Sequence, residues 1–96
     1  MEFIQIIECR TSKLDELTAL EDEWERATEG KRTLRRSIIA RDRNDPERHL
    51  VLAFFDSYES AMKNSELPET QAISEKMAAV SESPAFHDLD VVEDRS

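Results

Sequence analysis

The stretch that decides the fold is HLVLAFFDSYESAMKNSELPETQ, residues 49–71. Residues 49–55 combine aliphatic and aromatic side chains and predict a β-strand. After this strand the pattern changes, because Asp56 and Glu59 have the spacing of a capping box, in which an acidic side chain reaches back to the start of a helix. The stretch therefore predicts an apolar strand that turns directly into a helix.

An interruption follows within the helical part, at NSELPE, residues 64–69. Pro68 has no backbone N–H to donate, and it disfavours helical geometry at the preceding Leu67. Proline is nevertheless favoured in the first turn of a new helix. We therefore expect one short helix that ends near Ser65 and a second helix from Pro68 to Val80.

The rest of the chain supplies three more strands and one more helix. Apolar residues recur at spacings of three and four between residues 14 and 27, which predicts an amphipathic helix that Ser12 can cap and Gly30 can end. The expected strands lie at 2–9, 33–41 and 86–92, with a long turn at 42–48 and a linker at 81–85. The order β-α-β-β-α-β is typical of a ferredoxin-like α+β domain, with an antiparallel sheet and both helices on one face.

The third expected strand is apolar on both of its faces, which has a consequence for assembly. A sheet with one face in water alternates apolar and polar residues, but here Leu50, Leu52 and Phe54 face one way and Val51, Ala53 and Phe55 the other. The helices can cover only one of these faces. We therefore expect a second copy of the chain to cover the other face, in a two-fold homodimer packed sheet to sheet.

Length and charge limit the class of protein. The chain has 96 residues, which fits a single domain over 1–96, and its 22 acidic and 13 basic residues give a net charge of −9. Binding to nucleic acid or to an anionic membrane needs basic surface, so neither partner is expected. No secretory signal and no apolar run of membrane length is present, which predicts a soluble cytoplasmic protein.

The charge is unevenly distributed, with seven of the basic residues but only three acidic ones between residues 31 and 48. Two interpretations follow. The basic segment either pairs with the acidic helices or a partner subunit, which is the commoner case for charge runs, or it forms a local anion site.

Residue types that hold metals and cofactors are scarce. Cys9 is the only cysteine, and His49 and His87 lie on different expected strands without ligand spacing. The sequence also lacks a glycine-rich phosphate loop and a Cys-x-x-Cys pair. We therefore expect no metal and no cofactor.

The stretch HLVLAFFDSYESAMKNSELPETQAISEKM, residues 49–77, resembles the antibiotic-biosynthesis-monooxygenase-like proteins of the dimeric α/β-barrel superfamily. The resemblance extends as a pattern over nearly the whole chain. It implies two ferredoxin-like subunits that form a barrel, with a pocket in each subunit between sheet and helices. Some members oxidise aromatic substrates with oxygen alone and others degrade haem; the helical histidine of many enzymes falls at Asn64 here, while Gln5 and Trp24 depart from the haem-degrading pattern.

Six residues are candidates for a site, and each also has a structural interpretation. Asn64 and Ser65 can contact a ligand at the helix break or cap the two helices, and Trp24 can wall a pocket or fill the core. Asn64 is also a candidate for catalysis, and three further residues complete the set. The OH of Tyr58 and the imidazole of His49 are candidate proton carriers, and Arg36 can meet a ligand acid or a carboxylate of the partner subunit.

These residues favour a dimeric barrel that binds a small apolar or aromatic metabolite, with cofactor-independent monooxygenation as the candidate activity. Two alternatives stay open. One is a ligand-binding or stress-related barrel without catalysis, and the other is a protein-interaction module. A cavity in the subunit would favour the binding of a metabolite over a pure protein-interaction module.

Overall fold

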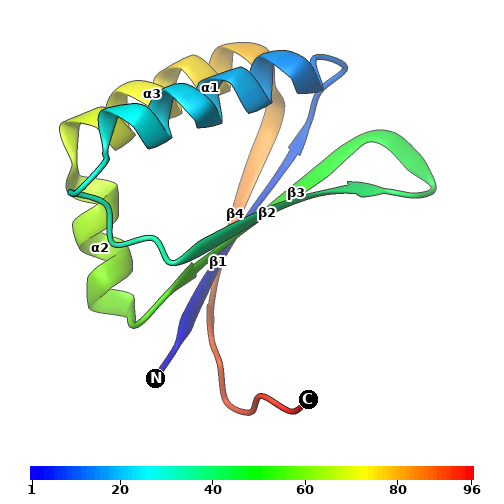
Figure 1. Cartoon of the computed structure of the whole chain (residues 1–96). Helices are drawn as coiled ribbons and strands as arrows, with labels where there is room; N and C mark the ends of the chain where they lie inside the picture. Colours follow the sequence, from blue (N-terminus) through cyan, green and yellow to red (C-terminus); the bar gives the residue numbers. More distant parts are fainter.

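The computed structural model describes the backbone of residues 1–96 and every side chain except that of Ser83. Four strands and three helices follow one another along the chain (Figure 1). They are β1 (Phe3–Arg10), α1 (Leu14–Ala27), β2 (Arg36–Asp42), β3 (Asp45–Phe55), α2 (Tyr58–Glu66), α3 (Pro68–Val80) and β4 (Glu82–Asp90). The expected ferredoxin-like α+β order is confirmed, with the second helix divided into α2 and α3.

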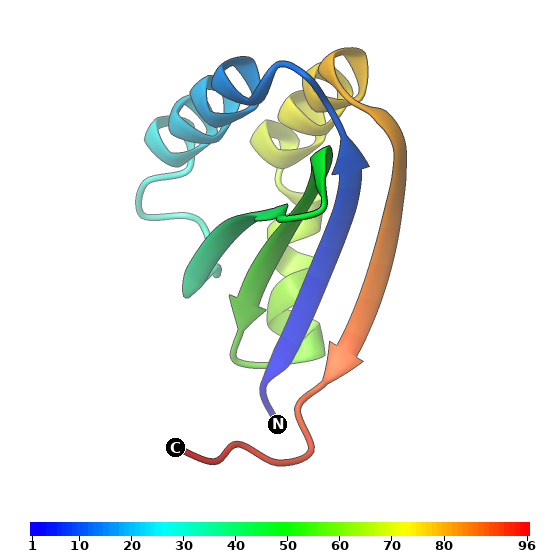
Figure 2. The ribbon, with the colours of Figure 1, turned by 90° about the vertical axis from the view of Figure 1, so that its right-hand side faces the viewer.

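The strands form one antiparallel sheet in the order β2-β3-β1-β4. Figure 2 shows the sheet with all three helices on one of its sides, and the opposite face has no covering element. The two central strands, β3 and β1, are the most apolar segments of the chain. This placement gives the sheet a helix-covered face and an open face.

The break between α2 and α3 is where the sequence predicts it. Leu67 adopts an extended conformation, and Pro68 begins α3. The cap of α2 differs from the prediction, because Ser57 rather than Asp56 precedes the helix, and its hydroxyl accepts the N–H of Ser60 at 3.1 Å. Serine directly before the first helical residue satisfies one of the free N–H groups without help from Asp56.

The start of α1 also differs from the prediction. Lys13 occupies the capping position and makes no side-chain cap, so Ser12 does not cap the helix. Thr11 takes part of that role, since its hydroxyl accepts the backbone N–H of Lys13 at 2.9 Å. At the other end the helix stops at Ala27, and Gly30 has a positive φ of 80° in the turn that follows.

The β2–β3 connection is tighter than the expected long turn. β3 extends back to Asp45, which leaves Arg43 and Asn44 as the turn. The register shifts after Arg41, so Pro46 lies in a bulge where no N–H is needed for pairing. β4 likewise begins at Glu82, inside the segment expected to be a linker.

The core lies between the helix-covered face and α2. It is formed by Phe3, Ala53, Phe55 and Ala61, with Leu34 and Met62 packed against it. The rings of Phe3 and Phe55 are 6.5 Å apart at an angle of 49°, a favourable tilted arrangement. This cluster holds α2 against the sheet, whereas α1 and α3 contact each other more than they contact the sheet.

The open face is apolar in its centre. Leu52 lies directly opposite Ile6 on β1 and Ile38 on β2. In the next row Phe54 lies opposite Ile4. All five side chains are half-buried within one chain, although no helix covers them.

The basic segment pairs with acidic residues, as the first interpretation of the charge run predicts. The guanidinium of Arg48 contacts the carboxylates of Glu8 and Asp42, each at 3.0 Å. Lys31 contacts Glu69 of α3 at 2.6 Å. These pairs are partly exposed, so each contributes only about 0–1 kcal/mol to stability.

Candidate active site

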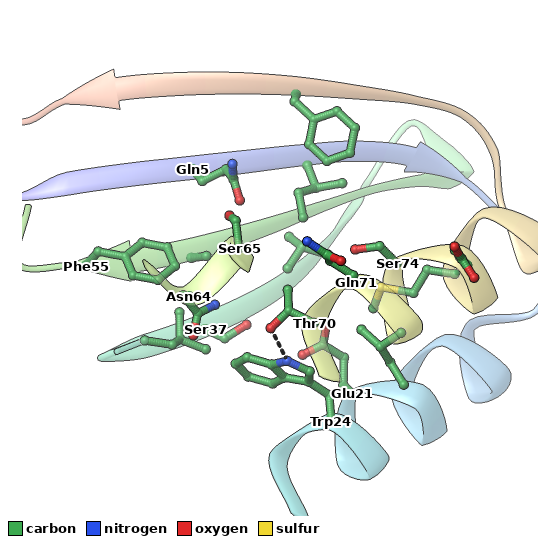
Figure 3. A pocket seen from close by; sticks show the side chains of 18 residues that line it. Gln5, Glu21, Trp24, Ser37, Phe55, Asn64, Ser65, Thr70, Gln71 and Ser74 are labelled. Carbon is green, nitrogen blue, oxygen red and sulfur yellow. Dashed lines mark hydrogen bonds between the residues drawn. The ribbon is translucent and has the colours of Figure 1, made fainter. Parts of the chain in front are cut away.

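A cavity of about 430 Å³ lies between the helix-covered face of the sheet and the three helices. This volume is in the range of pockets that hold small organic ligands. Figure 3 shows the side chains that line it. They are Gln5, Ile7, Glu21, Trp24, Leu34, Ser37, Val51, Ala53, Phe55, Asn64, Ser65, Thr70, Gln71, Ile73, Ser74, Glu75, Met77 and Phe86.

Trp24 forms one wall of the cavity and links two helices. Its indole N–H donates to the hydroxyl of Thr70 on α3 at 2.9 Å, drawn as the dashed line in Figure 3. The side chain is only 6% exposed, and the guanidinium of Arg32 lies 5.9 Å from its ring. The hydrogen bond and the cation–π contact fix the ring, so a flat aromatic face borders the cavity.

Asn64 lies near the end of α2, and its side chain caps neither α2 nor α3, unlike the capping interpretation of the sequence. Its Oδ1 accepts the backbone N–H of Thr33 at 3.3 Å, and its own carbonyl accepts the N–H of Leu67. The hydroxyl of Thr33 in turn donates to the carbonyl of Ser60. Asn64 therefore ties the segment before β2 to α2.

The amide nitrogen of Asn64 is free to donate a hydrogen bond into the cavity. It makes no hydrogen bond to any described residue, although the side chain is only 7% exposed. In Figure 3 it points away from the sheet segment toward the interior of the cavity. Ser65, the next residue, is half-buried and also lines the cavity. Two polar groups at the helix break are thus available to a ligand.

Glu21 is a cavity residue that the sequence reasoning missed. It lies on α1 between Leu17 and Trp24, four residues after the first and three before the second, so it shares their side of the helix. Burial raises the pKa of its carboxyl above the ordinary value, and the carboxylates of Glu25 and Asp22 raise it further. Its spacing from Leu17 and Trp24 is the available signal, but an acidic residue adds nothing to the apolar pattern that predicts the helix.

The electrostatics of the cavity are one-sided. Glu21 and Glu75 line it, and none of its lining residues is Lys, Arg or His. The other polar groups are amides and hydroxyls, from Gln5, Ser37 and their neighbours. Such a cavity disfavours anionic ligands, since no positive charge compensates their desolvation.

A second hollow of about 250 Å³ adjoins the first. The two share five lining residues, and the second is walled almost entirely by apolar atoms, including those of Cys9 and Leu17. Burial raises the pKa of the Cys9 thiol, which keeps it protonated and unreactive. The combined space has a polar end near Trp24 and an apolar end near Cys9.

Three sequence candidates lie outside this cavity. Arg36 is exposed on the open face, with its guanidinium 5.6 Å from the ring of Phe54. His49 is 2% exposed and packed in the sheet opposite Cys9, with Nδ1 2.9 Å from the carbonyl of Glu47. Tyr58 is half-exposed against Phe3. None of these three side chains lines the pocket at Trp24.

No group of three His, Cys, Asp or Glu side chains with the geometry of a metal site occurs among the described residues. None of the described helices is long and apolar enough to cross a membrane.

The class of protein follows first from the architecture, which is a ferredoxin-like α+β subunit with a pocket between its sheet and its helices. Solved structures with this fold include SnoaB from Streptomyces nogalater, a cofactor-independent oxygenase, at a TM-score of 0.82 and 10% identity over 97% of this chain and 95% of that one. A protein from Chloroflexus aurantiacus, assigned as an antibiotic biosynthesis monooxygenase, has a TM-score of 0.76 and 19% identity. The match covers 100% of this chain and 98% of that one. A protein from Nitrosomonas europaea with the same assignment has a TM-score of 0.77 and 12% identity, over 95% of this chain and 90% of that one.

No protein-family model matches the sequence, and no curated protein matches it either. The likeness is therefore one of structure at low sequence identity, and it extends over nearly the whole length of each protein. The chain has the fold of the antibiotic-biosynthesis-monooxygenase-like proteins, as the resemblance of residues 49–77 implied.

Proposed function

We propose that this protein is a homodimeric barrel that binds a small aromatic metabolite in the cavity at Trp24 and oxidises it with oxygen, without a cofactor. The observation that carries the proposal is the cavity itself, a space of about 430 Å³ between the sheet and the helices of a fold that SnoaB shares. A protein that acts only through its outer surface has no need of such a space. The alternative of a pure protein-interaction module therefore has the least support.

The chemistry of the lining supports this class of ligand. Trp24 and Phe55 offer flat apolar walls, while the amide nitrogen of Asn64 and the hydroxyl of Ser65 can fix a polar substituent. Oxidation of an electron-rich aromatic by oxygen alone requires mainly that the substrate be deprotonated and kept from water. The cavity supplies polar groups at one end and an apolar interior at the other.

The open face supports the homodimer. Its central row, Ile38–Leu52–Ile6, is apolar and has no covering element in the subunit. A second copy related by a two-fold axis would place the same row against itself, which makes the contact self-complementary. Sheet-to-sheet packing of this kind buries both apolar faces at a separation of about 10 Å.

Oxygen consumption tests the activity. Purified protein is mixed with a panel of anthrone-like phenols and quinols in an oxygen electrode, and the products are identified by mass spectrometry. We expect uptake that depends on protein and falls at least about tenfold in Trp24→Ala and Asn64→Ala. Arg43→Ala, in the exposed β2–β3 turn, is the control and should match the wild type. Uptake that is the same in all four proteins would contradict a role for the cavity.

A second candidate function is ligand binding without catalysis. It is favoured by the lack of a histidine among the lining residues of the cavity. The position where the resemblance places a helical histidine is occupied by Asn64. Binding of aromatic compounds without oxygen uptake by any of them would select this candidate.

A further inference from the structure

Glu21 is the least expected residue of the cavity. On α1, Leu17, Trp24 and Thr28 form the side that faces the rest of the protein, and they are 2%, 6% and 0% exposed. Glu21 lies on this same side, between Leu17 and Trp24. A carboxylate there loses part of its hydration, which destabilises the charged form.

The side chain has no partner that would compensate this loss. Neither an ion pair nor a hydrogen bond joins the Glu21 carboxylate to any described residue, whereas Glu23, two residues on, contacts Lys76 at 2.9 Å. The charged groups that act on its carboxyl are acidic, namely Glu25 and Asp22 on its own helix. Glu75 of α3 also lines the cavity. A partly buried, unpaired carboxylate that points into a pocket is a feature of ligand sites rather than of stable cores.

We propose that Glu21 is the proton acceptor of the cavity and that it selects a neutral aromatic ligand carrying an acidic hydroxyl group. The ligand's hydroxyl donates to the Glu21 carboxylate while its ring lies against Trp24, one turn along α1. Figure 3 shows the two side chains leaving α1 together, with Thr70 of α3 opposite them. The aromatic ligand and its oxidation rest on the proposed function above; the role of Glu21 is additional.

The step assigned to Glu21 is a proton transfer. The O–H bond of the ligand breaks, its electron pair stays on oxygen, and the proton moves to the carboxylate, which leaves a neutral Glu21 and a phenolate. The surroundings raise the pKa of Glu21, which makes its carboxylate a stronger base than an exposed one. The indole N–H of Trp24 is already donated to Thr70, so it does not compete for the carboxylate.

A pair of ligands that differ only in the hydroxyl tests the proposal. 2-Naphthol and its methyl ether, 2-methoxynaphthalene, are titrated into ¹⁵N-labelled protein, and the single indole signal of Trp24 reports binding. We expect the wild type to prefer the naphthol by about tenfold to a hundredfold, as a hydrogen bond to a charged group implies. Glu21→Gln should reduce this preference to about threefold or less, because a neutral amide is a weaker acceptor.

The control is Glu29→Gln, which removes the same charge from an exposed residue outside the cavity. It should keep the full preference of the wild type. Equal affinity for naphthol and ether in the wild type, or a preference that survives in Glu21→Gln, would overturn the proposal. So would tighter binding of 2-naphthylmethylammonium than of naphthol, because that result would make Glu21 a site for cations.

Oxygen uptake separates this inference from the proposed function. A hydroxyl preference that depends on Glu21, with no uptake for any substrate, supports the role of Glu21 in binding and rejects the oxidation. Uptake that is equal in the wild type and in Glu21→Gln leaves the oxidation standing and rejects Glu21 as its proton acceptor.

Discussion

The two faces of the sheet are built from the same strands, yet their side chains differ in how far they are buried. On the helix-covered face, Phe55, Ala53 and Val51 of β3 are fully buried, but a cavity remains above them. On the open face, Phe54 and Leu52 of the same strand are only half-buried and no element covers them. The first face is covered by helices, but a cavity remains between them and the sheet. The second face carries apolar side chains, and no helix covers it.

The two faces therefore offer two kinds of binding surface. The covered face has a concave space with mixed polar and apolar walls, which suits a small molecule. The centre of the open face is a row of aliphatic side chains from Ile38, Leu52 and Ile6, which suits a second sheet. Substitutions on one face should therefore change ligand binding or subunit stability, and substitutions on the other should change assembly.

The strongest test of the comparison is Leu52→Glu at the centre of the open face. Between two packed sheets it would bury a carboxylate without a partner, once in each subunit, and each such charge costs about 3–5 kcal/mol. We expect the dissociation constant of the dimer to rise by about a thousandfold or more. Light scattering coupled to gel filtration would then give the mass of a monomer.

Ala72→Glu is the control for this variant, since it introduces the same side chain at an exposed position of α3. It should leave the mass unchanged. A wild-type protein that is monomeric at micromolar concentration would show that the open face has another role.

The neighbouring phenylalanines on the two faces give the next largest effect. Phe55→Ala removes a fully buried ring that packs on Phe3, so we expect the free energy of unfolding to fall by about 3–5 kcal/mol. Phe54→Ala should cost the isolated subunit less, because its ring is half-buried there. Urea denaturation at low protein concentration measures both; equal losses would mean that the two faces are equally buried in the subunit.

A smaller effect is expected at the helix break. Asn64→Ala leaves the partly buried backbone N–H of Thr33 without its acceptor, which costs about 1 kcal/mol. Asn64→Asp keeps an oxygen in that position and loses the free N–H₂ that faces the cavity. Thermal unfolding should thus separate Asn64→Ala from the wild type more than Asn64→Asp, and ligand binding should be weakened in both.

Most of the fold was accessible from local patterns. The apolar strand at 49–55 and the effect of Pro68 are properties of neighbouring residues, and both are confirmed. The errors lie at element ends, where tertiary contacts decide. β3 extends to Asp45 because a bulge accommodates Pro46, a feature that depends on pairing with β2.

The site was harder to predict, because it depends on which face of each helix is buried. Trp24, Asn64 and Ser65 were selected from residue type and position, and all three line the cavity. His49 was selected from residue type alone and is packed in the sheet instead. Glu21 is not predicted, because the spacing of apolar residues that indicates the buried side of α1 gives no signal for an acidic residue.

The smallest and most specific prediction concerns Glu21 and pH. Its pKa is raised in the folded protein, so the folded state holds this proton more tightly than the unfolded state does, and the charged side chain destabilises the fold above its folded pKa. Glu21→Gln should therefore be more stable than the wild type at pH 7. This advantage should shrink as the pH falls through the raised pKa and vanish below about pH 4, where the carboxyl is protonated in both states. Glu29→Gln, which removes the same charge from an exposed residue outside the cavity, is the control in parallel urea titrations. A stability gain in Glu21→Gln that does not change with pH would contradict this prediction.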